Sequence, residues 1–454
     1  MNGLMSDSPI APSMVDLFAG AGGLSAGFSR AGYELIGAVE HWAPASKTLQ
    51  ANHPDLFVED RDIRKVEAEE FLSYLPRRPN LVLGGPSCQG FSTSGGFSKV
   101  CGRDISDERN SLFLDFIRFV EVLQPEWVVM ENVPGLLLFK RGHVAAEVIK
   151  QFRVIGYYVV PMILLAADFG VPQLRRRLFF VGNRTGSGIP FPVPTNGNPD
   201  LWKGFALPFE HLSRIGNKST SSTIMPHVSF RDACGDLPPI KPGGDPSIDL
   251  EYSSLPLSDF QRIMRTPDSE KVSLHYAFTP SSFERAAIKV LKPGQNWNSL
   301  PAELKTGRFS RIRPYDATTL MRRLSDDLPA YTINTKFNDA TTGAYIHPSQ
   351  NRTLSVREAA RLQSFTDDYL FLGSLPEIRK QIGNAVPTLL AERIARSLRP
   401  SLLKDMGFNA VCDIDNANQY LVDPDQDVSS LIGLKGSRPM ASSQPVSQLS
   451  LFAE

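Results

Sequence analysis

The feature that most constrains the fold is the regular alternation of short apolar runs with helical stretches over residues 14–184. Four stretches carry helical periodicity: Ser25–Ala31, Pro44–Asn52, Ser111–Leu123 and Val144–Ile155. The apolar runs, expected as strands, are Val15–Ala19, Leu35–Glu40, Leu81–Gly84, Trp127–Glu131 and Leu178–Val181. Strands separated by helices at this pace predict a doubly wound α/β sheet, which binds its ligands where the carboxyl ends of the strands lie.

Composition limits the class of protein. Lys and Arg total 48 and so do Asp and Glu, so the formal net charge of zero excludes a polybasic protein that binds by gross charge. Four cysteines without a CxxC pair suggest neither a disulfide scaffold nor a zinc site. We find no apolar run of membrane-spanning length and no signal peptide. The chain is expected to be soluble in a reducing compartment, with no membrane contact.

The second half of the chain is less regular. From about Pro190, Pro, Ser, Thr and Asn become frequent, and residues 262–323 hold 12 Lys and Arg against 5 Asp and Glu. This basic stretch is either a solvated surface or a phosphate-facing lobe. Helical pattern returns at Ser355–Gln363 and Thr388–Leu398, and residues 404–454 carry 7 acids and 3 bases. The expected division is an α/β domain in two parts, 1–189 and 346–400, an irregular domain, 190–345, and a flexible acidic tail, 401–454.

A glycine-rich turn follows the first expected strand. In Asp16–Gly23 the glycines Gly20, Gly22 and Gly23 allow close backbone approach to a ligand, although a tight turn without a ligand is the alternative. Glu40 ends the next strand and suits bidentate hydrogen bonding to ribose hydroxyls. The residues Phe18, Trp42, Asp62 and Ile63 are positioned to hold an adenine ring, so the pattern favours a nucleotide-like ligand.

Two further strand ends carry reactive side chains. Cys88 lies in a Gly-rich loop after a buried strand, which is a poor place for an inert core residue and a good one for a nucleophile. Glu131 emerges from the apolar run at residues 127–130. Burial would raise the pKa of its carboxyl toward that of a general acid.

Six motifs occur in a recognisable order. They are DLFAGAGG (16–23), PSCQGFS (86–92), ENV (131–133), QLRRR (173–177), RTLSVREAARLQSF (352–365) and QIGNAVP (381–387). Their order resembles that of the DNA cytosine-5 methyltransferases, from Met14 to about Arg396. The segment between roughly Pro190 and Leu324 is less recognisable. Ser87 stands where the family usually has a second proline, so we expect a changed loop backbone with retained chemistry.

The resemblance implies a Rossmann-like sheet that binds S-adenosylmethionine and a set of site residues. The α/β parts 1–189 and 346–400 would then form the catalytic domain, and 190–345 would be the target-recognition domain. Cys88 would be the nucleophile, Glu131 would engage cytosine N3 and Arg177 would reach cytosine O2. Arg175 would support the site or touch phosphate, as would Ser92, and Gln89 would assist flipping of the base. The cofactor-binding set would be Phe18, Gly20, Gly22, Gly23, Glu40, Trp42, Asp62, Ile63, Pro86, Leu112 and Asn384. The helix Ser355–Gln363 would act as a scaffold between the lobes.

The implied activity is methyl transfer to C5 of a flipped-out cytosine in duplex DNA, in a bacterial cytoplasm and on its nucleoid, protecting DNA from a restriction enzyme. Arg308, Arg311 and Arg313 of the basic stretch would contact DNA. One alternative is a tRNA cytosine-5 methyltransferase of the same fold. The long segment between Arg177 and Arg352 favours DNA. A second alternative is a catalytically inactive DNA-binding module, which the retained Cys88 and Glu131 disfavour.

The extreme C-terminus carries a separate signal. The peptide Gln448, Leu449, Ser450, Leu451 and Phe452 resembles the short peptide by which bacterial replication proteins dock on the sliding clamp. A flexible tether would present a glutamine and a Leu-Phe pair to a polar and an apolar subsite. An accidental Leu-Phe pair in a disordered end is the equal alternative.

Overall fold

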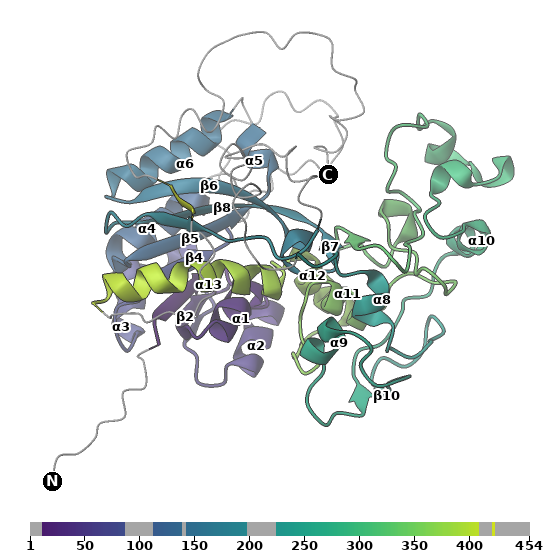
Figure 1. The fold of residues 1–454 in the computed structure, drawn as a ribbon, viewed down its shortest axis with the longest axis horizontal. Coiled ribbons are helices and arrows are strands. Elements are labelled where there is room, and N and C mark those ends of the chain that lie inside the picture. The colour runs from purple at the N-terminus through teal and green to yellow at the C-terminus, as the bar shows by residue number, and fades with distance from the viewer. Residues whose placement is uncertain (1–10, 87–111, 139–141, 198–223, 408–419, 423–454) are drawn as a thin grey trace, which may run out of the picture.

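The computed structural model describes residues 11–86, 112–138, 142–197, 224–407 and 420–422, and its centre is a seven-stranded sheet (Figure 1). The strand order is β3-β2-β1-β4-β5-β8-β6, and all pairs are parallel except those that β8 makes with β5 and β6. The strands are β1 (Ser13–Leu17), β2 (Glu34–Val39), β3 (Val58–Glu59), β4 (Leu81–Gly84), β5 (Trp127–Asn132), β6 (Tyr158–Leu165) and β8 (Arg176–Asn183). The doubly wound α/β class is confirmed. The strand order reverses at β1, so the turns after β1 and β4 face each other.

Alternation along each strand builds two hydrophobic layers. In β5, Trp127 and Val129 pack on one side of the sheet, whereas Val128 and Met130 pack on the other. Side chains alternate because a strand has a period of two residues. The helices α1 (Gly23–Arg30) and α13 (Thr388–Asp405) cover the first side. The second side is covered by α3 (Ala68–Tyr74), α4 (Leu112–Leu123) and α6 (His143–Val154), with the short α5 (Gly135–Leu138) beside them.

The sequence did not predict several elements of the catalytic part, of which β6 and α12 matter most here. Strand β6 contains Pro161, which normally argues against a strand. The proline is tolerated because β6 is the last strand in the sheet, where one row of backbone groups has no strand partner. The second is α12 (Leu375–Asn384), which begins with a capping box of Ser374 and Glu377 and ends inside the QIGNAVP motif.

The chain returns from the second lobe to the sheet through three helices. These are α11 (Val356–Leu362), α12 and α13. Helix α13 packs closely on α1, where a Cβ added to Gly27 would lie 2.3 Å from the carbonyl oxygen of Thr388. Only a glycine allows this approach. Helix α13 continues to Asp405, beyond the boundary expected at residue 400, and β13 (Tyr420–Val422) pairs with β9 (Ile189–Phe191).

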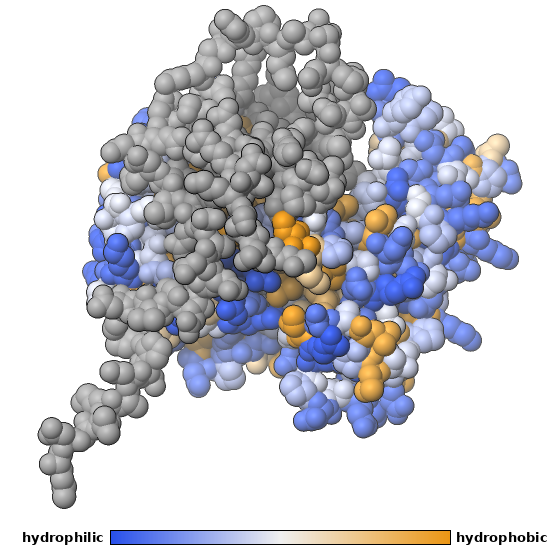
Figure 2. Space-filling model, in the orientation of Figure 1, coloured by the Kyte–Doolittle hydropathy of each residue, from blue (hydrophilic) through white to orange (hydrophobic). Residues whose placement is uncertain are grey.

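The second lobe lies beside the sheet and has two differently packed parts (Figure 1). The helices α8 (Phe230–Cys234) and α9 (Asp259–Met264) share the hydrophobic core of the α1–α13 side of the sheet. The region around α10 (Ser282–Val290) has its own small core built on Trp297 and Phe309. Two small ladders complete the lobe: β10 (Leu250–Glu251) with β11 (Lys271–Val272), and β12 (Ala330–Tyr331) with β7 (Gln173–Leu174). In the view of Figure 2 its surface is mostly hydrophilic with separate apolar patches.

Candidate active site at the carboxyl edge of the sheet

The turn after β1 is fixed by its neighbour β2. Phe18, Gly20 and Gly22 all have positive φ angles, of 61°, 57° and 82°. Glu40 follows β2, and its two carboxylate oxygens each accept one backbone N–H, from Gly20 and from Trp42, both at 2.7 Å. The carboxylate therefore ties the ends of two strands together. Each Glu40 oxygen can still accept one more hydrogen bond. Two ribose hydroxyls could therefore donate to this carboxylate.

Asp62 and Ile63 lie at the end of β3, as the sequence indicated. Ile63 is buried, whereas Asp62 caps the short helix at Ile63–Lys65 and forms an ion pair with Arg64 at 2.6 Å. Hydrogen bonding to Arg64 lowers the pKa of Asp62 to about 2. The Asp62 carboxylate is thus held ionised and can only accept hydrogen bonds, as recognition of an adenine amino group requires.

No role was predicted from the sequence for Asp16, a buried acid beneath the glycine turn. Asp16 in β1 is fully buried, and neither carboxyl oxygen makes a hydrogen bond of normal geometry with a described residue. Burial raises the pKa of Asp16 to about 8, and the nearby Ser25 offsets only part of this effect. An unpartnered polar group under a ligand-binding turn is costly in a protein that binds nothing there. The Asp16 carboxyl and the free Glu40 lone pairs fit a polar, nucleoside-bearing ligand such as S-adenosylmethionine.

The last motif meets the first one in space. A Cβ added to Gly23 would lie 2.5 Å from the carbonyl oxygen of Val386, so the QIGNAVP segment touches the start of α1. Asn384, at the end of α12, has an exposed side chain. The hydroxyl of Tyr369 also donates to the carbonyl of Ala21 in the glycine turn. The structure thus brings together residues about 360 positions apart in the chain, at the edge where the cofactor is expected.

A partly buried ion pair lies at the end of β5. Arg177 Nε is 2.9 Å from Glu131 Oε1, and both side chains are 15% exposed. Strands β5 and β8 place the pair because they are antiparallel neighbours. Burial raises the pKa of Glu131, although Arg177 and Arg175 act in the opposite direction. Burial likewise lowers the pKa of Arg177. The site therefore combines a carboxyl whose raised pKa favours protonation with a guanidinium that can donate hydrogen bonds to a ligand oxygen.

Arg175 has a different place from Arg177. Its guanidinium is buried and donates to the backbone carbonyls of Ile333 at 2.6 Å, Ala385 at 3.0 Å and Gly383 at 3.2 Å. Burial lowers the pKa of Arg175. The side chain holds the QIGNAVP segment and the start of the returning chain behind the Glu131–Arg177 pair. This geometry agrees with support of the site.

The loop that carries the expected nucleophile is seen only at its base. Pro86 is the last described residue after β4, and its carbonyl accepts a hydrogen bond from Asn132 Nδ2 at 3.2 Å. A Cβ added to Gly85 would lie 3.0 Å from Glu131 Oε2, so the loop base touches the acid. Leu112 opens α4 and packs against the core on that side of the sheet. Cys88, Gln89 and Ser92 lie outside the described residues.

The three arginines expected to contact DNA are all exposed in the second lobe. Arg308 donates to the carbonyl of Thr341 and lies over the ring of Phe309. Arg313 pairs with Asp316 at 2.8 Å. No side-chain partner of Arg311 is found in the described parts of the chain. Arg308 and Arg313 would thus have to give up or share an existing contact to bind a ligand, which Arg311 would not need to do with any described residue.

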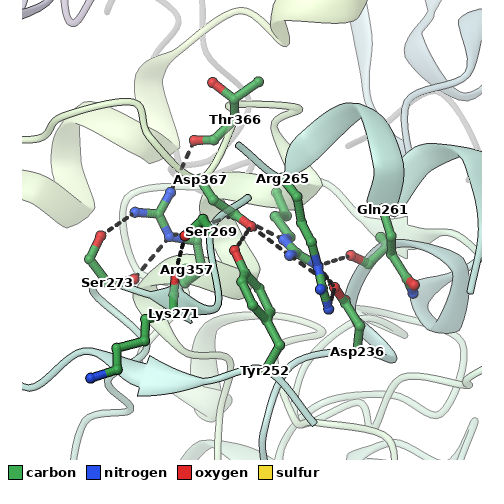
Figure 3. A network of polar contacts seen from close by, with 12 residues as sticks. Asp236, Tyr252, Gln261, Arg265, Ser269, Lys271, Ser273, Arg357, Thr366 and Asp367 are labelled. Atoms are coloured by element: carbon green, nitrogen blue, oxygen red, sulfur yellow. Dashed lines mark hydrogen bonds and ion pairs between the residues drawn. The ribbon is translucent and has the colours of Figure 1, made fainter. Parts of the chain in front are cut away.

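The motif RTLSVREAARLQSF takes part in a network of buried ion pairs between the two lobes. The guanidinium of Arg361 is fully buried and pairs with Asp236 and with Asp367. Figure 3 labels both aspartates and their other partners. Asp236 also accepts from Arg265 at 2.7 Å, and Asp367 accepts from the hydroxyl of Tyr252 at 2.6 Å. Asp236, Tyr252 and Arg265 come from the second lobe and were not identified in the sequence. The available signal was the spacing of Arg357 and Arg361, which are four residues apart and therefore lie on one face of α11.

The described residues contain no group of three or more His, Cys, Asp and Glu that could hold a metal ion. Within the same residues, no helix has the length and apolar character needed to cross a membrane.

Known proteins share this arrangement. The model of the C-5 cytosine-specific DNA methylase family matches residues 13–399. Type II methyltransferase M1.HphI of Haemophilus parahaemolyticus is 34% identical over 386 residues, covering 85% of this chain and 86% of that protein. Type II methyltransferase M.AgeI of Thalassovita gelatinovora is 31% identical over 438 residues, covering 86% and 99%. A structure described as a DNA modification methyltransferase encoded within a prophage (E. coli) superposes with a TM-score of 0.61 at 24% identity, covering 87% of this chain and all of that one, and so shares the fold. This chain belongs to the C-5 cytosine-specific DNA methylase family.

Proposed function

We infer that the protein is a DNA cytosine-5 methyltransferase of a restriction–modification system. The family and the type II methyltransferases similar over most of the chain support this activity. The observation that carries it in this chain is the partly buried Glu131–Arg177 pair at the carboxyl edge of the sheet, in contact with the base of the Cys88 loop. An acid, a cation and a cysteine-bearing loop meet there, as addition to a pyrimidine ring requires.

The cofactor of this reaction is S-adenosylmethionine, which supplies the electrophilic methyl group when bound. The residues that would hold it are those at the ends of β1, β2 and β3, together with Asn384 and the buried Asp16. Glu40 would accept from the ribose hydroxyls while it keeps its bonds to Gly20 and Trp42. Pro86 and Leu112 would flank the same site from β4 and α4.

We propose that Cys88 supplies the nucleophile. C5 of cytosine is too weak a nucleophile by itself, and addition of the Cys88 thiolate to C6 makes C5 electron-rich. After methylation the C5 proton leaves to a base and the C6–sulfur bond breaks, which restores the aromatic ring and the thiolate. Because C6 is inaccessible in a duplex, the base must first be flipped out, a step that we assign to Gln89. Ser92 of the same loop would support the site or touch phosphate.

The Glu131–Arg177 pair would handle the charge that this addition creates. Negative charge develops at N3 and O2 of the ring as the thiolate adds. A protonated Glu131 donates to N3, and its raised pKa favours that form. Arg177 steers O2 from the other side of the ion pair. Arg175 keeps the pair's surroundings in place through its three carbonyl contacts.

Replacement of the nucleophile tests the proposal. Cys88→Ser should abolish methyl transfer to DNA while binding of S-adenosylhomocysteine is retained, because an alcohol is far less readily ionised than a thiol. Cys101→Ser is the matched control and should keep its activity. A stable complex of the unaltered protein with 5-fluorocytosine DNA would show the covalent step. Full activity of Cys88→Ser would overturn the mechanism, and absence of the complex would favour an inactive DNA-binding module.

The nucleic acid is tested separately. Matched DNA and tRNA substrates with labelled cofactor should show transfer to DNA alone. The second lobe, with its excess of basic residues at 262–323, is proposed to face the duplex. Bisulfite sequencing of DNA from cells that express the protein would give the recognised sequence.

We also propose that the C-terminal peptide 448–452 docks on a bacterial sliding clamp. These residues lie outside the described part of the chain, so the proposal stands on the sequence QLSLF alone. A peptide of residues 440–454 should bind a bacterial clamp with about micromolar affinity, and Leu451→Ala with Phe452→Ala should remove that binding. The same double variant should methylate short DNA normally. No binding at high micromolar peptide would refute this role.

A further inference from the structure

Helix α12 of the catalytic part places a cation on an aromatic ring beside the expected cofactor site. Lys380 Nζ in α12 lies 4.2 Å from the centroid of the Trp42 indole. This is the geometry of a cation–π contact, and tryptophan is the aromatic residue that binds cations best. Within the described residues, no carboxylate lies at ion-pair distance from Lys380, whose side chain is otherwise exposed.

The contact is part of a chain that joins three segments. The backbone N–H of Trp42 donates to Glu40, and the other Glu40 oxygen accepts from Gly20. Lys380 therefore connects α12 through Trp42 and Glu40 to the glycine turn after β1. Helix α12 also contacts α2 (Ala43–Asn52), the helix that begins directly after Trp42. The backbone of Trp42 is thus held by Glu40, and its indole lies against Lys380.

The position of Lys380 on its helix points in the same direction. Lys380 and Asn384 are four residues apart, so their side chains lie on one face of α12. Asn384 is the residue of this helix expected to close the methionine end of the cofactor. Lys380 lies on the same face and contacts Trp42, which is the residue expected beside the adenine ring of the cofactor.

We propose that Lys380 is a positioning residue for S-adenosylmethionine, acting through Trp42. It holds the indole beside Glu40 so that the nucleoside meets a preformed surface, which lowers the ordering cost of binding. This inference rests on the proposed cofactor. It predicts an effect on cofactor affinity and little effect on the chemical step, because Lys380 touches no reacting atom.

Calorimetric titration of the full chain with S-adenosylhomocysteine tests it. Lys380→Met should raise the dissociation constant about threefold to tenfold, the range of a partly exposed cation–π contact. Lys380→Arg should restore affinity to within about twofold of the unaltered protein, because a guanidinium also binds an indole face. Lys150→Met, on the far helix α6, is the matched control and should bind normally. In steady state the KM for cofactor should rise with kcat within about twofold.

A second variant shows whether Lys380 acts through the ring. In a Trp42→Leu background, Lys380→Met should cause no further loss of affinity. A further loss there would mean that Lys380 contacts the ligand directly and would overturn the inference. So would normal affinity of Lys380→Met, or equal loss in the Met and Arg variants. Failure of the unaltered protein to bind S-adenosylhomocysteine would instead refute the proposed cofactor.

Discussion

Two regions of this protein bury charge, and they do so in opposite ways. At the end of β5, Glu131 forms an ion pair with Arg177, and burial raises the pKa of its carboxyl. At the junction of the lobes, Arg361 pairs with two aspartates, and its hydrogen bonds and charges outweigh burial and keep the pKa of Asp367 below its ordinary value. The first carboxyl is poised to take a proton, whereas the second is held ionised.

The difference teaches what each region is for. A buried charge that is fully hydrogen-bonded fixes one packing arrangement, because removal of either partner leaves the other uncompensated. A buried carboxyl with few partners is easily protonated and is therefore available for chemistry. Variants in the two regions should separate loss of activity from loss of stability.

The largest expected effect is on activity. Glu131→Gln should lower the rate of methyl transfer by about 10²- to 10⁴-fold, since glutamine keeps the shape of the side chain and loses the transferable proton. The free energy of unfolding should fall by about 1 kcal/mol, because the glutamine oxygen can still accept a hydrogen bond from Arg177 and only the charge of the pair is lost. Single-turnover kinetics and thermal unfolding measure the two. A variant with more than a tenth of normal activity would remove Glu131 from the mechanism.

The next effect is on stability. Arg361→Met should lower the free energy of unfolding by about 3 to 5 kcal/mol, because Asp236 and Asp367 would be left buried without their partner. Arg313→Ala is the control: Arg313 is 82% exposed in its ion pair, and the loss there should be below about 1 kcal/mol. Chemical denaturation gives both numbers. Equal losses in the two variants would contradict the distinction drawn between the lobe junction and the surface.

A smaller effect depends on pH. The pKa of Asp16 is about 8 in the folded chain against an ordinary 3.8, so between these values the folded state holds a proton that the unfolded state releases. Stability therefore falls as pH rises through this window. Asp16→Asn removes the titration and should be more stable than the unaltered protein at pH 8, by on the order of 2 kcal/mol, with no gain near pH 4.

Asp62 should behave with the opposite sign. Its pKa is lowered to about 2, so it stabilises the fold above its ordinary pKa and this contribution is lost as pH falls toward 2. Asp62→Asn should thus cost stability at pH 7. Thermal unfolding across pH 4 to 8 compares the two variants. A gain from Asp16→Asn that does not grow with pH would show that Asp16 is ionised in the folded protein.

The smallest effect concerns surface charge in the second lobe. Arg311→Ala should lower the dependence of log affinity for DNA on log salt by roughly one unit if Arg311 contacts a phosphate. Arg313→Ala should lower it less, because Asp316 already neutralises Arg313. Binding of duplex DNA at several salt concentrations measures both slopes. No change in either affinity or slope would remove this stretch from the interface.

Part of the fold and site could be predicted because the signals are local. Strand β4 occupies Leu81–Gly84 as predicted, and the other four expected strands differ by only a few residues at their ends. The glycine turn, Glu40 and Glu131 were identifiable because a strand end, a turn and a following helix are encoded within about ten residues of one another. Strand β6 was not predicted because it contains Pro161. A proline is tolerated in an edge strand, and the local sequence does not show which strand lies at the edge of the sheet.

Other features were decided only by the tertiary structure. Arg175 and Arg177 belong to one short motif, yet one holds backbone carbonyls of a distant segment and the other pairs with Glu131. Asp236 and Arg361 are 125 residues apart and meet only because two lobes pack. The sequence alone determined which segments become strands, turns and helices, since these depend on neighbouring side chains and backbone freedom. The tertiary structure decided which buried charges are saturated and which remain available, because burial and partner number are properties of the packed molecule.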